Sequence, residues 1–312
     1  MLRKLAPLND SSVLALALTA IMFVPACTTA DEVELGSSDH SLVGPNGSDL
    51  NGSDLNGPTL PGAVTIWTSL DGVTVNGTTL DAATLDASVF HGNAGATTYS
   101  GADFVGAQFQ AMRGDGSTAT IRIASIAGQT PSRWSYFVEY LESDSQWYPI
   151  CENASGPLAA YALPGTWNYQ SDVANGGAHT NDATKFTFAC RTRGALAKCI
   201  DDGYVPWLSD HGVSLADHHQ ACVRMFRADY CGNGHSYTTN GRLINLYDGI
   251  GIQADTEAFR VEAEWTPTGA RCLTDARRAS IAVSCFGAPA PDPGCGDVAH
   301  FGSGTLMMNE IP

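Results

Sequence analysis

The chain has 312 residues and a formal net charge of −16, yet only 15% of its residues are charged and 44% are hydrophobic. Such an acidic chain repels nucleic-acid phosphates and anionic lipid surfaces, which excludes nucleic acid as an expected partner. The hydrophobic content is that of a folding chain and not of a disordered acidic tail, and the length allows one sizeable core with an appendage.

Residues 1–26 have the pattern of a secretory signal peptide. Arg3 and Lys4 make the start basic, and an apolar run follows from Val13 to Ala26. This run is shorter than the roughly 20 residues that a membrane-spanning helix needs, and it ends in small residues, as a cleavage site does. We therefore expect the rest of the chain to be exported.

Cys27 follows Val24-Pro25-Ala26, and together these four residues resemble a bacterial lipobox. In a lipobox the cysteine is lipidated and becomes the new N-terminus, so residues 27–45 are predicted to be a lipid-anchored linker. The residue after the lipidated cysteine is Thr28 and not Asp, which resembles a signal that sorts the lipoprotein to the outer membrane. The expected partner is thus the membrane, through the lipid. Cleavage after Ala30, which would release a soluble secreted protein, is the alternative.

Residues 46–110 repeat a large apolar residue every five positions. The repeated residues are Leu50, Leu55, Leu60, Leu70, Val75, Leu80, Leu85 and Phe90, and after a slip of one residue Tyr99, Phe104 and Phe109. This spacing suits a chain that turns a corner every five residues and sends one side chain inward at each face. The segment resembles the pentapeptide-repeat family, whose fold is a four-sided right-handed β-helix. A flexible Gly/Asn/Ser spacer is the alternative.

Residues 113–287 are predicted to form an α+β domain, that is, a disulfide-rich mixed domain of antiparallel strands with two helices. Runs of β-branched and aromatic residues indicate strands at 118–126, 134–141, 147–151, 185–190, 243–247, 259–265 and 281–286. One helix is expected over 195–202, and a second from a cap at Ser214 to Gly232. Residues 288–312 are predicted to form a Pro-rich C-terminal tail that Cys295 pins back.

The sequence contains nine cysteines. With Cys27 lipidated, an even set of eight remains, and in an exported chain such a set indicates up to four disulfides. These eight are Cys151, Cys190, Cys199, Cys222, Cys231, Cys272, Cys285 and Cys295. If Cys222 and Cys231 share a helix, a rise of roughly 13 Å separates them, whereas a disulfide needs Cα atoms within about 7 Å. They should therefore have different partners; the sequence leaves the pairing open.

Residues 219–232 contain the run Ala228-Asp229-Tyr230-Cys231 and resemble the signature of the ADYC domain. This family occurs mainly in exported proteins of myxobacteria. The resemblance covers roughly residues 115–287 and includes further motifs in order. These are Ala189-Cys190-Arg191, Gly194–Cys199, Gly203–Trp207, Glu262–Trp265 and Ala270–Cys272. The resemblance implies no activity and no catalytic residue.

Two arrangements of residues could support hydrolysis at the cell envelope. Cys231 could act as a thiol nucleophile with His235 as base and Asp229 orienting it. Glu262 and Glu264, two apart on a predicted strand, should share one face beside Trp265, as the paired carboxylates of a glycosidase do. In an oxidising compartment, however, a cysteine is more often bridged, and strand carboxylates are more often solvated.

A metal-binding module is a further alternative. His218, His219 and Cys222 have a ligand-like spacing, and His211 or His235 could complete a zinc site. The acidic loops at Asp201-Asp202 and Asp115 offer too few oxygen ligands for calcium. Taken together, the sequence favours a non-enzymatic, structural or ligand-binding lipoprotein of the cell envelope without a cofactor, and it does not identify the ligand.

Overall fold

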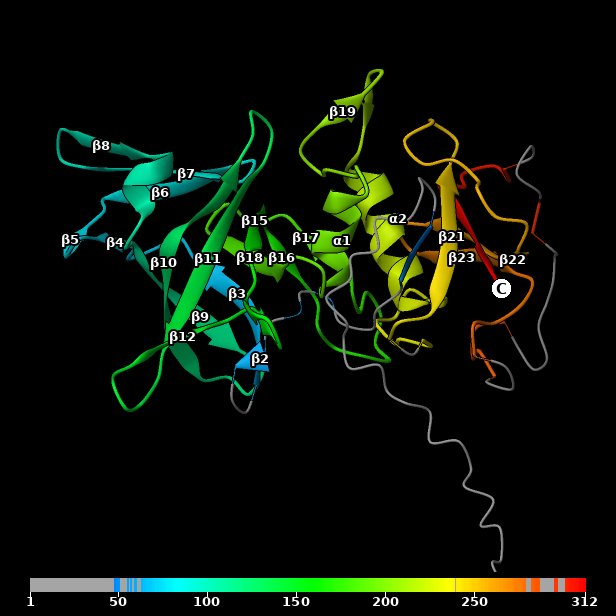
Figure 1. Ribbon diagram of the computed structural model, residues 1–312, viewed down its shortest axis with the longest axis horizontal. Helices are drawn as coiled ribbons and strands as arrows, with labels where there is room; N and C mark the ends of the chain where they lie inside the picture. Colours follow the sequence, from blue (N-terminus) through cyan, green and yellow to red (C-terminus); the bar gives the residue numbers. More distant parts are fainter. Residues whose placement is uncertain are drawn as a thin grey trace, which may run out of the picture. The chain divides into compact units, whose positions relative to one another are not determined.

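The computed structural model describes residues 48–50, 55, 57, 59–60, 63–238, 240–278, 282–286, 295–296 and 301–312 (Figure 1). All of these residues fall within one unit that spans residues 37–312. The predicted signal peptide, the lipidation site Cys27 and the linker 27–45 lie outside the described residues.

Six antiparallel strands close into a barrel. In spatial order they are β3 (Ala63–Ser69), β18 (Lys185–Cys190), β15 (Ala160–Pro164), β11 (Trp134–Leu141), β10 (Thr118–Gln129) and β9 (Gln108–Arg113), and β9 pairs again with β3. Short strands extend this sheet: β2 (Thr59–Leu60), β4 (Thr74–Val75), β5 (Thr78–Thr79) and β12 (Trp147–Pro149). The register shifts twice along the β10–β11 pair. Such irregularities bend a strand, which allows a sheet to curve and close.

Aromatic side chains fill the barrel. A three-stranded sheet supplies one of them: it consists of β6 (Ala82–Asp86), β7 (Val89–Ala94) and β8 (Thr97–Ser100), and the short helix η1 (Gly101–Phe104) follows it. Phe90 on β7 is fully buried, with its ring 5.3 Å from Phe109, 5.4 Å from Tyr136 and 5.1 Å from Phe186. The Tyr136 hydroxyl donates to the carbonyl oxygen of Ser88 over 2.7 Å, which fixes the β6–β7 turn.

No β-helix is identified among the described residues of the 46–110 segment. Several side chains of the five-residue repeat do point inward, since Leu55, Leu70, Val75, Leu80, Phe90, Phe104 and Phe109 are buried. However, β4 pairs antiparallel with β5, and β7 pairs antiparallel with both β6 and β8, each time with a neighbour in sequence and through a tight turn. Asn76 and Gly77 both take positive φ, 51° and 80°, in the β4–β5 turn. Asn-Gly favours a two-residue hairpin turn, so the period of five reflects short hairpins.

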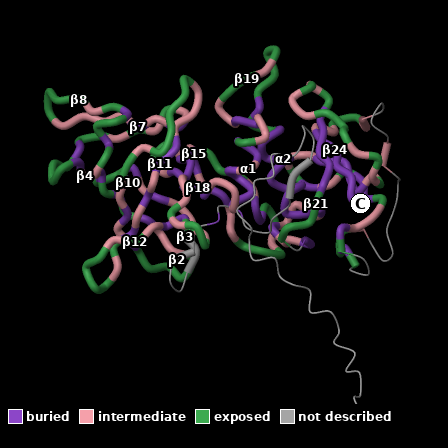
Figure 2. Tube along the Cα trace, viewed as in Figure 1, coloured by how far each residue is buried: buried purple, intermediate pink, exposed green. Residues whose placement is uncertain are grey.

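A five-stranded sheet forms the second β structure. Its order is β1 (Ser48–Leu50), β21 (Leu243–Asp248), β24 (Met307–Ile311), β22 (Arg260–Thr266) and β23 (Gly269–Leu273). β24 comes from the end of the predicted C-terminal tail, yet it lies between β21 and β22, and all five of its residues are buried (Figure 2). The C-terminus is therefore a central strand of this sheet.

The described residues contain two α-helices, as predicted, besides the short helix η1. α1 (Ala195–Asp201) ends before Gly203, and α2 (Ala216–Arg227) packs against α1 and against β22, β23 and β24. α2 is shorter than predicted. Its N-cap is Leu215, with no side-chain cap hydrogen bond. Among the described residues, no helix has both the length and the apolar character required to cross a membrane.

Short pairs and turns complete the described chain. The pairs are β13 (Glu152–Asn153) with β14 (Gly156–Pro157), β16 (Thr166–Trp167) with β17 (His179–Thr180), and β19 (Ser209–Asp210) with β20 (Val213–Ser214). The predicted strand over 281–286 is not found in the described residues 282–286. These instead turn, with the N–H of Phe286 donating to the carbonyl of Val283.

Four disulfides join the eight cysteines that follow Cys27. The pairs are Cys151–Cys190, Cys199–Cys222, Cys231–Cys285 and Cys272–Cys295. Cys222 and Cys231 have different partners, as expected. The helix ends at Arg227, so the two cysteines do not share it.

Candidate functional site

The run from Ala228 to Cys231 lies where α2 ends. Ala228 is the C-cap and adopts a left-handed conformation with φ 50°. Its N–H donates to the carbonyl oxygen of Met225. A left-handed residue at this position stops the helix and reverses the chain. Asp229, Tyr230 and Cys231 therefore point into three different surroundings.

Asp229 is fully buried and joins the helix to two loops. Its carboxylate forms an ion pair with the buried guanidinium of Arg224, and Arg227 lies 3.6 Å away. It also accepts hydrogen bonds from the backbone N–H groups of Asn233, at 3.1 Å, and Gly234, at 3.0 Å. A buried carboxylate needs such partners because desolvation otherwise penalises its charge. Asp229 therefore organises the turn after the helix.

Tyr230 and Glu262 tie this turn to the five-stranded sheet. The Tyr230 hydroxyl donates to Glu262 on β22 over 2.5 Å and accepts from the backbone N–H of Arg277 over 2.9 Å. Burial raises the pKa of Tyr230, and the neighbouring carboxylate of Glu262 raises it further. Asn309 on β24 also donates to Glu262 over 2.5 Å. The phenol therefore stays protonated and serves as a donor.

Arg277 completes this cluster from a segment after β23. Its guanidinium lies 3.0 Å from the Glu262 carboxylate, and both side chains are almost fully buried. It also donates to the carbonyl oxygens of Phe226, over 3.1 Å, and Met225, over 2.9 Å. These carbonyls belong to the last turn of α2, where the N–H donors of a following helical turn are missing; the Met225 carbonyl also accepts from the N–H of Ala228. Arg277 thus caps the helix and neutralises Glu262 at once.

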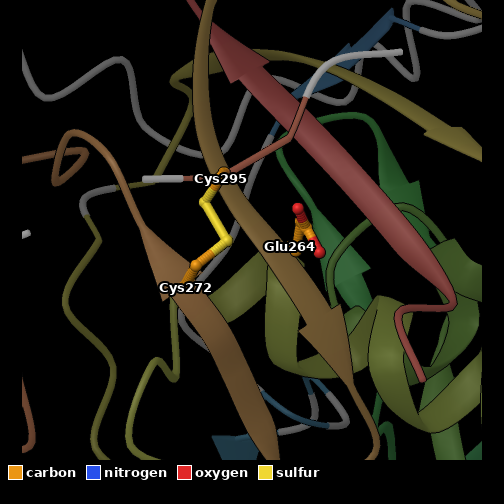
Figure 3. Close-up of side chains that lie close together, drawn as sticks. All are labelled: Glu264, Cys272 and Cys295. Carbon is orange, nitrogen blue, oxygen red and sulfur yellow. A yellow bond between two sulfur atoms is a disulfide. The ribbon is translucent and has the colours of Figure 1, made fainter. Parts of the chain in front are cut away.

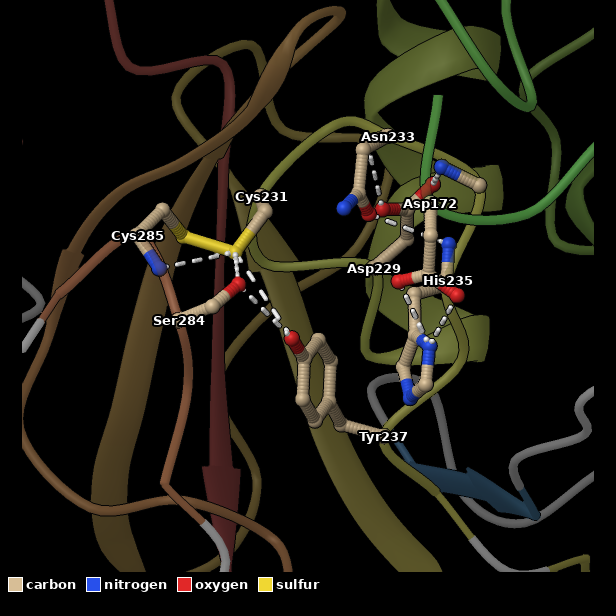
Figure 4. The surroundings of a disulfide bond; sticks show 9 residues. Asp172, Asp229, Cys231, Asn233, His235, Tyr237, Ser284 and Cys285 are labelled. Carbon is tan, nitrogen blue, oxygen red and sulfur yellow. Dashed lines mark hydrogen bonds and ion pairs between the residues drawn. A yellow bond between two sulfur atoms is a disulfide. The ribbon is translucent and has the colours of Figure 1, made fainter. Parts of the chain in front are cut away.

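Cys231 is held in a disulfide with Cys285, with Cα atoms 5.6 Å apart (Figure 4). The predicted base, His235, does not approach it. The Nδ1 atom of His235 lies 3.0 Å from a carboxylate oxygen of Asp172. This hydrogen bond holds the pKa of Asp172 below its ordinary value. The structure therefore does not bring Cys231, His235 and Asp229 together as a nucleophile with its base.

Glu262 and Glu264 do not converge on one space, contrary to the sequence-based expectation. Glu262 faces the residues at the end of α2. Glu264 instead bonds to the C-terminal segment: it accepts from the N–H of Gly296 at 2.7 Å and of Gly302 at 3.1 Å, and from the Thr305 hydroxyl. The pairing register of β22 shifts between Val261 and Ala263, and this shift breaks the simple alternation of faces.

Hydrogen bonding keeps Glu264 ionised although it is buried. Burial raises its pKa, but the hydrogen bonds from Thr305, from the Gly296 N–H and from Arg271 at 2.9 Å lower it, and the net shift is downward. Its oxygens already have four donors. Glu264 is thus a structural carboxylate and not a general acid.

One group in the described part of the chain has metal-like geometry: Glu264, Cys272 and Cys295, whose ligand atoms lie within 4.8 Å of one another (Figure 3). The two sulfur atoms, however, form a disulfide with each other. A metal ligand must be a thiolate, and Glu264 is occupied by its donors. In this oxidised form the group does not fit a metal ion.

The predicted zinc ligands on α2 are also separated by their bonding. Cys222 is bridged to Cys199. His219 is buried and contacts the carbonyl oxygen of Leu196 through Nε2 at 3.0 Å. His218 is 4% exposed and packs its ring 6.3 Å from Tyr204. The helix spacing is as expected, but the sulfur is not available.

The two acidic segments have internal partners as well. Asp201, the last residue of α1, accepts a hydrogen bond from Tyr161 at 2.7 Å and pairs with Arg191 at 3.0 Å. Asp115 closes a turn through Ser117. Neither segment gathers further oxygen ligands for calcium in these contacts.

Sequence reasoning identified the motif but missed most of its partners. Arg277, Asn309 and the glycine pair Gly176-Gly177 all contact the motif or its neighbours from distant parts of the chain. A Cβ on Gly177 would lie 2.6 Å from Arg224 and 3.1 Å from Asp229, and its φ is 70°. That positive φ and close approach require glycine. The glycine pair was therefore a usable signal, whereas Arg277 and Asn309 carried none.

The described chain is a disulfide-stapled protein that joins an antiparallel barrel to a helix-covered sheet. A comparison with protein families matches residues 101–279 to the ADYC domain. The chain belongs to the ADYC domain family, which has no assigned function. A comparison with curated proteins found no match, and neither did a comparison with solved structures.

The matched range leaves out strands that complete both sheets. β3 closes the barrel between β18 and β9, and it precedes residue 101. β24 occupies the middle of the five-stranded sheet and follows residue 279. The fold of this chain therefore extends beyond the family match on both sides.

Proposed function

We propose that the protein is an exported lipoprotein in which the ADYC domain is a structural or ligand-binding module of the cell envelope. Four disulfides support an extracytoplasmic location, because such bonds form and persist in oxidising compartments. They involve all the cysteines of the sequence except Cys27, the cysteine of the lipobox-like run. Cys27 is the one cysteine that these four disulfides leave out, and this supports a distinct role for it.

The motif side chains are bonded to other groups of the protein, and this supports a non-catalytic role. Asp229 is bound by Arg224 and two backbone N–H groups, Tyr230 by Glu262 and Arg277, and Cys231 by Cys285. A catalytic group must reach its substrate with a free donor, acceptor or nucleophilic atom. The motif instead connects the end of α2 to the sheet and to the segment around Cys285.

Metabolic labelling with an alkyne fatty acid tests the anchor. The wild-type protein should carry the label and fractionate with the outer membrane. Cys27→Ser should lose both properties, and Thr28→Ser, the matched control next to it, should keep the label. An unlabelled wild-type protein in the medium would instead support cleavage after Ala30 and soluble secretion.

Alkylation of the denatured native protein tests the disulfide-stapled state. With Cys27 lipidated and eight cysteines bridged, no thiol should react before reduction. Two or more alkylated cysteines in the exported protein would contradict the proposal. Reduced cysteines with Met1 retained would place the protein in the cytosol and overturn it.

A further inference from the structure

The four disulfides differ in their access to solvent. Cys151–Cys190 and Cys199–Cys222 join pairs of buried residues, and Cys272 is buried beside half-buried Cys295. Cys285, in contrast, is exposed, and its partner Cys231 is half-buried. An attacking thiolate must approach one sulfur directly, so exposure distinguishes this bridge from the other three.

Among the described residues, the hydrogen-bond donors around this bridge gather on one of its two sulfurs. The Sγ atom of Cys231 lies 3.3 Å from the backbone N–H of Cys285, 3.6 Å from the Ser284 hydroxyl and 3.9 Å from the Tyr237 hydroxyl (Figure 4). The two hydroxyls are 3.3 Å apart. Donors of this kind stabilise a thiolate, and a stabilised thiolate leaves faster in disulfide exchange. The surroundings therefore favour Cys231 as the departing sulfur.

We propose that Cys231–Cys285 is a thiol-exchange site, at which an external dithiol, the reactive group of thiol–disulfide oxidoreductases, opens the bridge in the folded protein. One thiolate of the dithiol attacks Sγ of Cys285 and forms a mixed disulfide, while the bond to Cys231 breaks. The electron pair leaves on Cys231, which takes a proton from water. The second thiol of the dithiol loses its proton to water and attacks the dithiol sulfur of the mixed disulfide. The bond to Cys285 breaks, Cys285 leaves as a thiolate and takes up a proton, and the dithiol closes into a disulfide. The dithiol is thus oxidised by two electrons and the bridge is reduced.

The fold around the bridge does not depend on the covalent bond alone. Val283, two residues before Cys285, is buried in the core of the helix and sheet. Tyr230, next to Cys231, keeps its hydrogen bonds to Glu262 and Arg277. Opening the bridge should therefore loosen residues 282–286 while α2 and the sheet stay in place. The proposal holds whether or not Cys27 carries a lipid.

Stepwise reduction of the native, full-length protein by dithiothreitol tests this order. Thiols are alkylated at intervals and each cysteine is assigned by peptide mass spectrometry, while circular dichroism reports the fold. Cys231 and Cys285 should be alkylated at least about tenfold faster than any other pair, since each of the other three bridges contains at least one buried cysteine and must wait for local opening, and the spectrum should persist. Earlier alkylation of another pair, or reduction only together with unfolding, would overturn the proposal.

Glutathione, a monothiol, tests which sulfur departs. After a short reaction and alkylation with N-ethylmaleimide, glutathione should be found on Cys285 and maleimide on Cys231. The reverse distribution would contradict the assigned direction. Ser284→Ala, at an exposed position, should slow the reaction by about threefold to tenfold because it removes a donor from the departing sulfur. Ser143→Ala, on a distant exposed turn, should leave the rate unchanged; an equal loss in both variants would remove the role of Ser284.

Discussion

The two cores of this protein differ in the kinds of side chain that they contain. The barrel core consists of apolar and aromatic side chains such as Phe90, Phe109 and Phe186, together with one disulfide. The core between α2 and the five-stranded sheet also has apolar residues, but beside them lie the buried charges of Arg224, Asp229, Glu262, Glu264 and Arg277. The other three disulfides belong to this second core and its surface.

This difference matters because the two kinds of core fail in different ways. An apolar core loses stability in proportion to the volume that is removed from it. A buried ion pair adds little net stability compared with apolar residues, but removing one partner leaves an uncompensated charge. The second core should therefore lose little stability when both partners of an ion pair are replaced, and much more when only one partner is replaced. The ADYC motif lies in this core, which explains why its side chains have internal partners.

The largest expected effect is that of Phe90→Ala. Phe90 is fully buried among five aromatic rings, so its truncation should lower the free energy of unfolding by about 4 kcal/mol. Chemical denaturation under oxidising conditions measures this change. Tyr148→Ala, at a 40% exposed position, is the control and should cost below about 1 kcal/mol. Similar losses in both variants would show that the barrel core is not packed around Phe90.

Arg277→Gln should cost about 3 kcal/mol, because Glu262 stays buried without its cation and the last carbonyls of α2 lose donors. The double variant Glu262→Gln/Arg277→Gln sharpens the comparison of the two cores. Its loss should fall short of the sum of the two single losses by about 1–3 kcal/mol. Additive losses would mean that the pair acts as two independent residues, as in an apolar core.

Because His219 is buried, we expect the protein to lose stability in mild acid. Burial, opposed in part by its contact with the Leu196 carbonyl, lowers its pKa to about 4, whereas the unfolded chain keeps the ordinary value near 6.5. As the pH falls from 6.5 to 4, the unfolded state gains a proton that the folded state excludes. The free energy of unfolding should therefore fall by about 2–3 kcal/mol across this window. His219→Gln should flatten this part of the profile, and an unchanged slope would assign the effect to other groups.

The smallest effect is expected for Arg271→Ala. Arg271 pairs with Glu264 at 2.9 Å, and Glu264 lies on the same strand as Glu262. The side chain of Arg271, however, is 40% exposed. Glu264 keeps three other donors, so the loss should be below about 1 kcal/mol. This variant is the matched control for Arg277→Gln. An equal cost for the two arginines would remove the distinction between a buried and a surface-exposed pair.

Several elements could be predicted from local sequence because local chemistry decides them. The strands at 134–141 and 185–190 were predicted with the bounds that the structure has, since each is a run of β-branched and aromatic residues. Seven of the periodic apolar residues of the first third, among them Leu70, Phe90 and Phe109, are buried as expected, whereas Leu85 and Tyr99 are half-buried. Their fold was not predicted, because antiparallel hairpins and β-helix coils share that phase and differ in turn geometry.

The candidate site divides in the same way. Asp229, Tyr230 and Cys231 stand out in the sequence as a contiguous motif. The partners of Asp229, such as Arg224 and Gly234, lie within five residues of it. Tyr230, however, depends on Glu262, 32 residues away, and Cys231 on Cys285, 54 residues away. Neither the pairing of eight cysteines nor the cation that pairs with Glu262 has a local signature.

By itself, the amino-acid sequence determined the even set of eight cysteines, the two helices, many of the strands and the family motif. These depend on composition and on contacts within a few residues. The tertiary structure alone decided that strand Met307–Ile311 lies in the middle of a sheet, that the barrel closes through Ala63–Ser69, and that the motif has its partners inside the protein. The reason is physical: long-range burial selects one partner among many that are chemically equivalent.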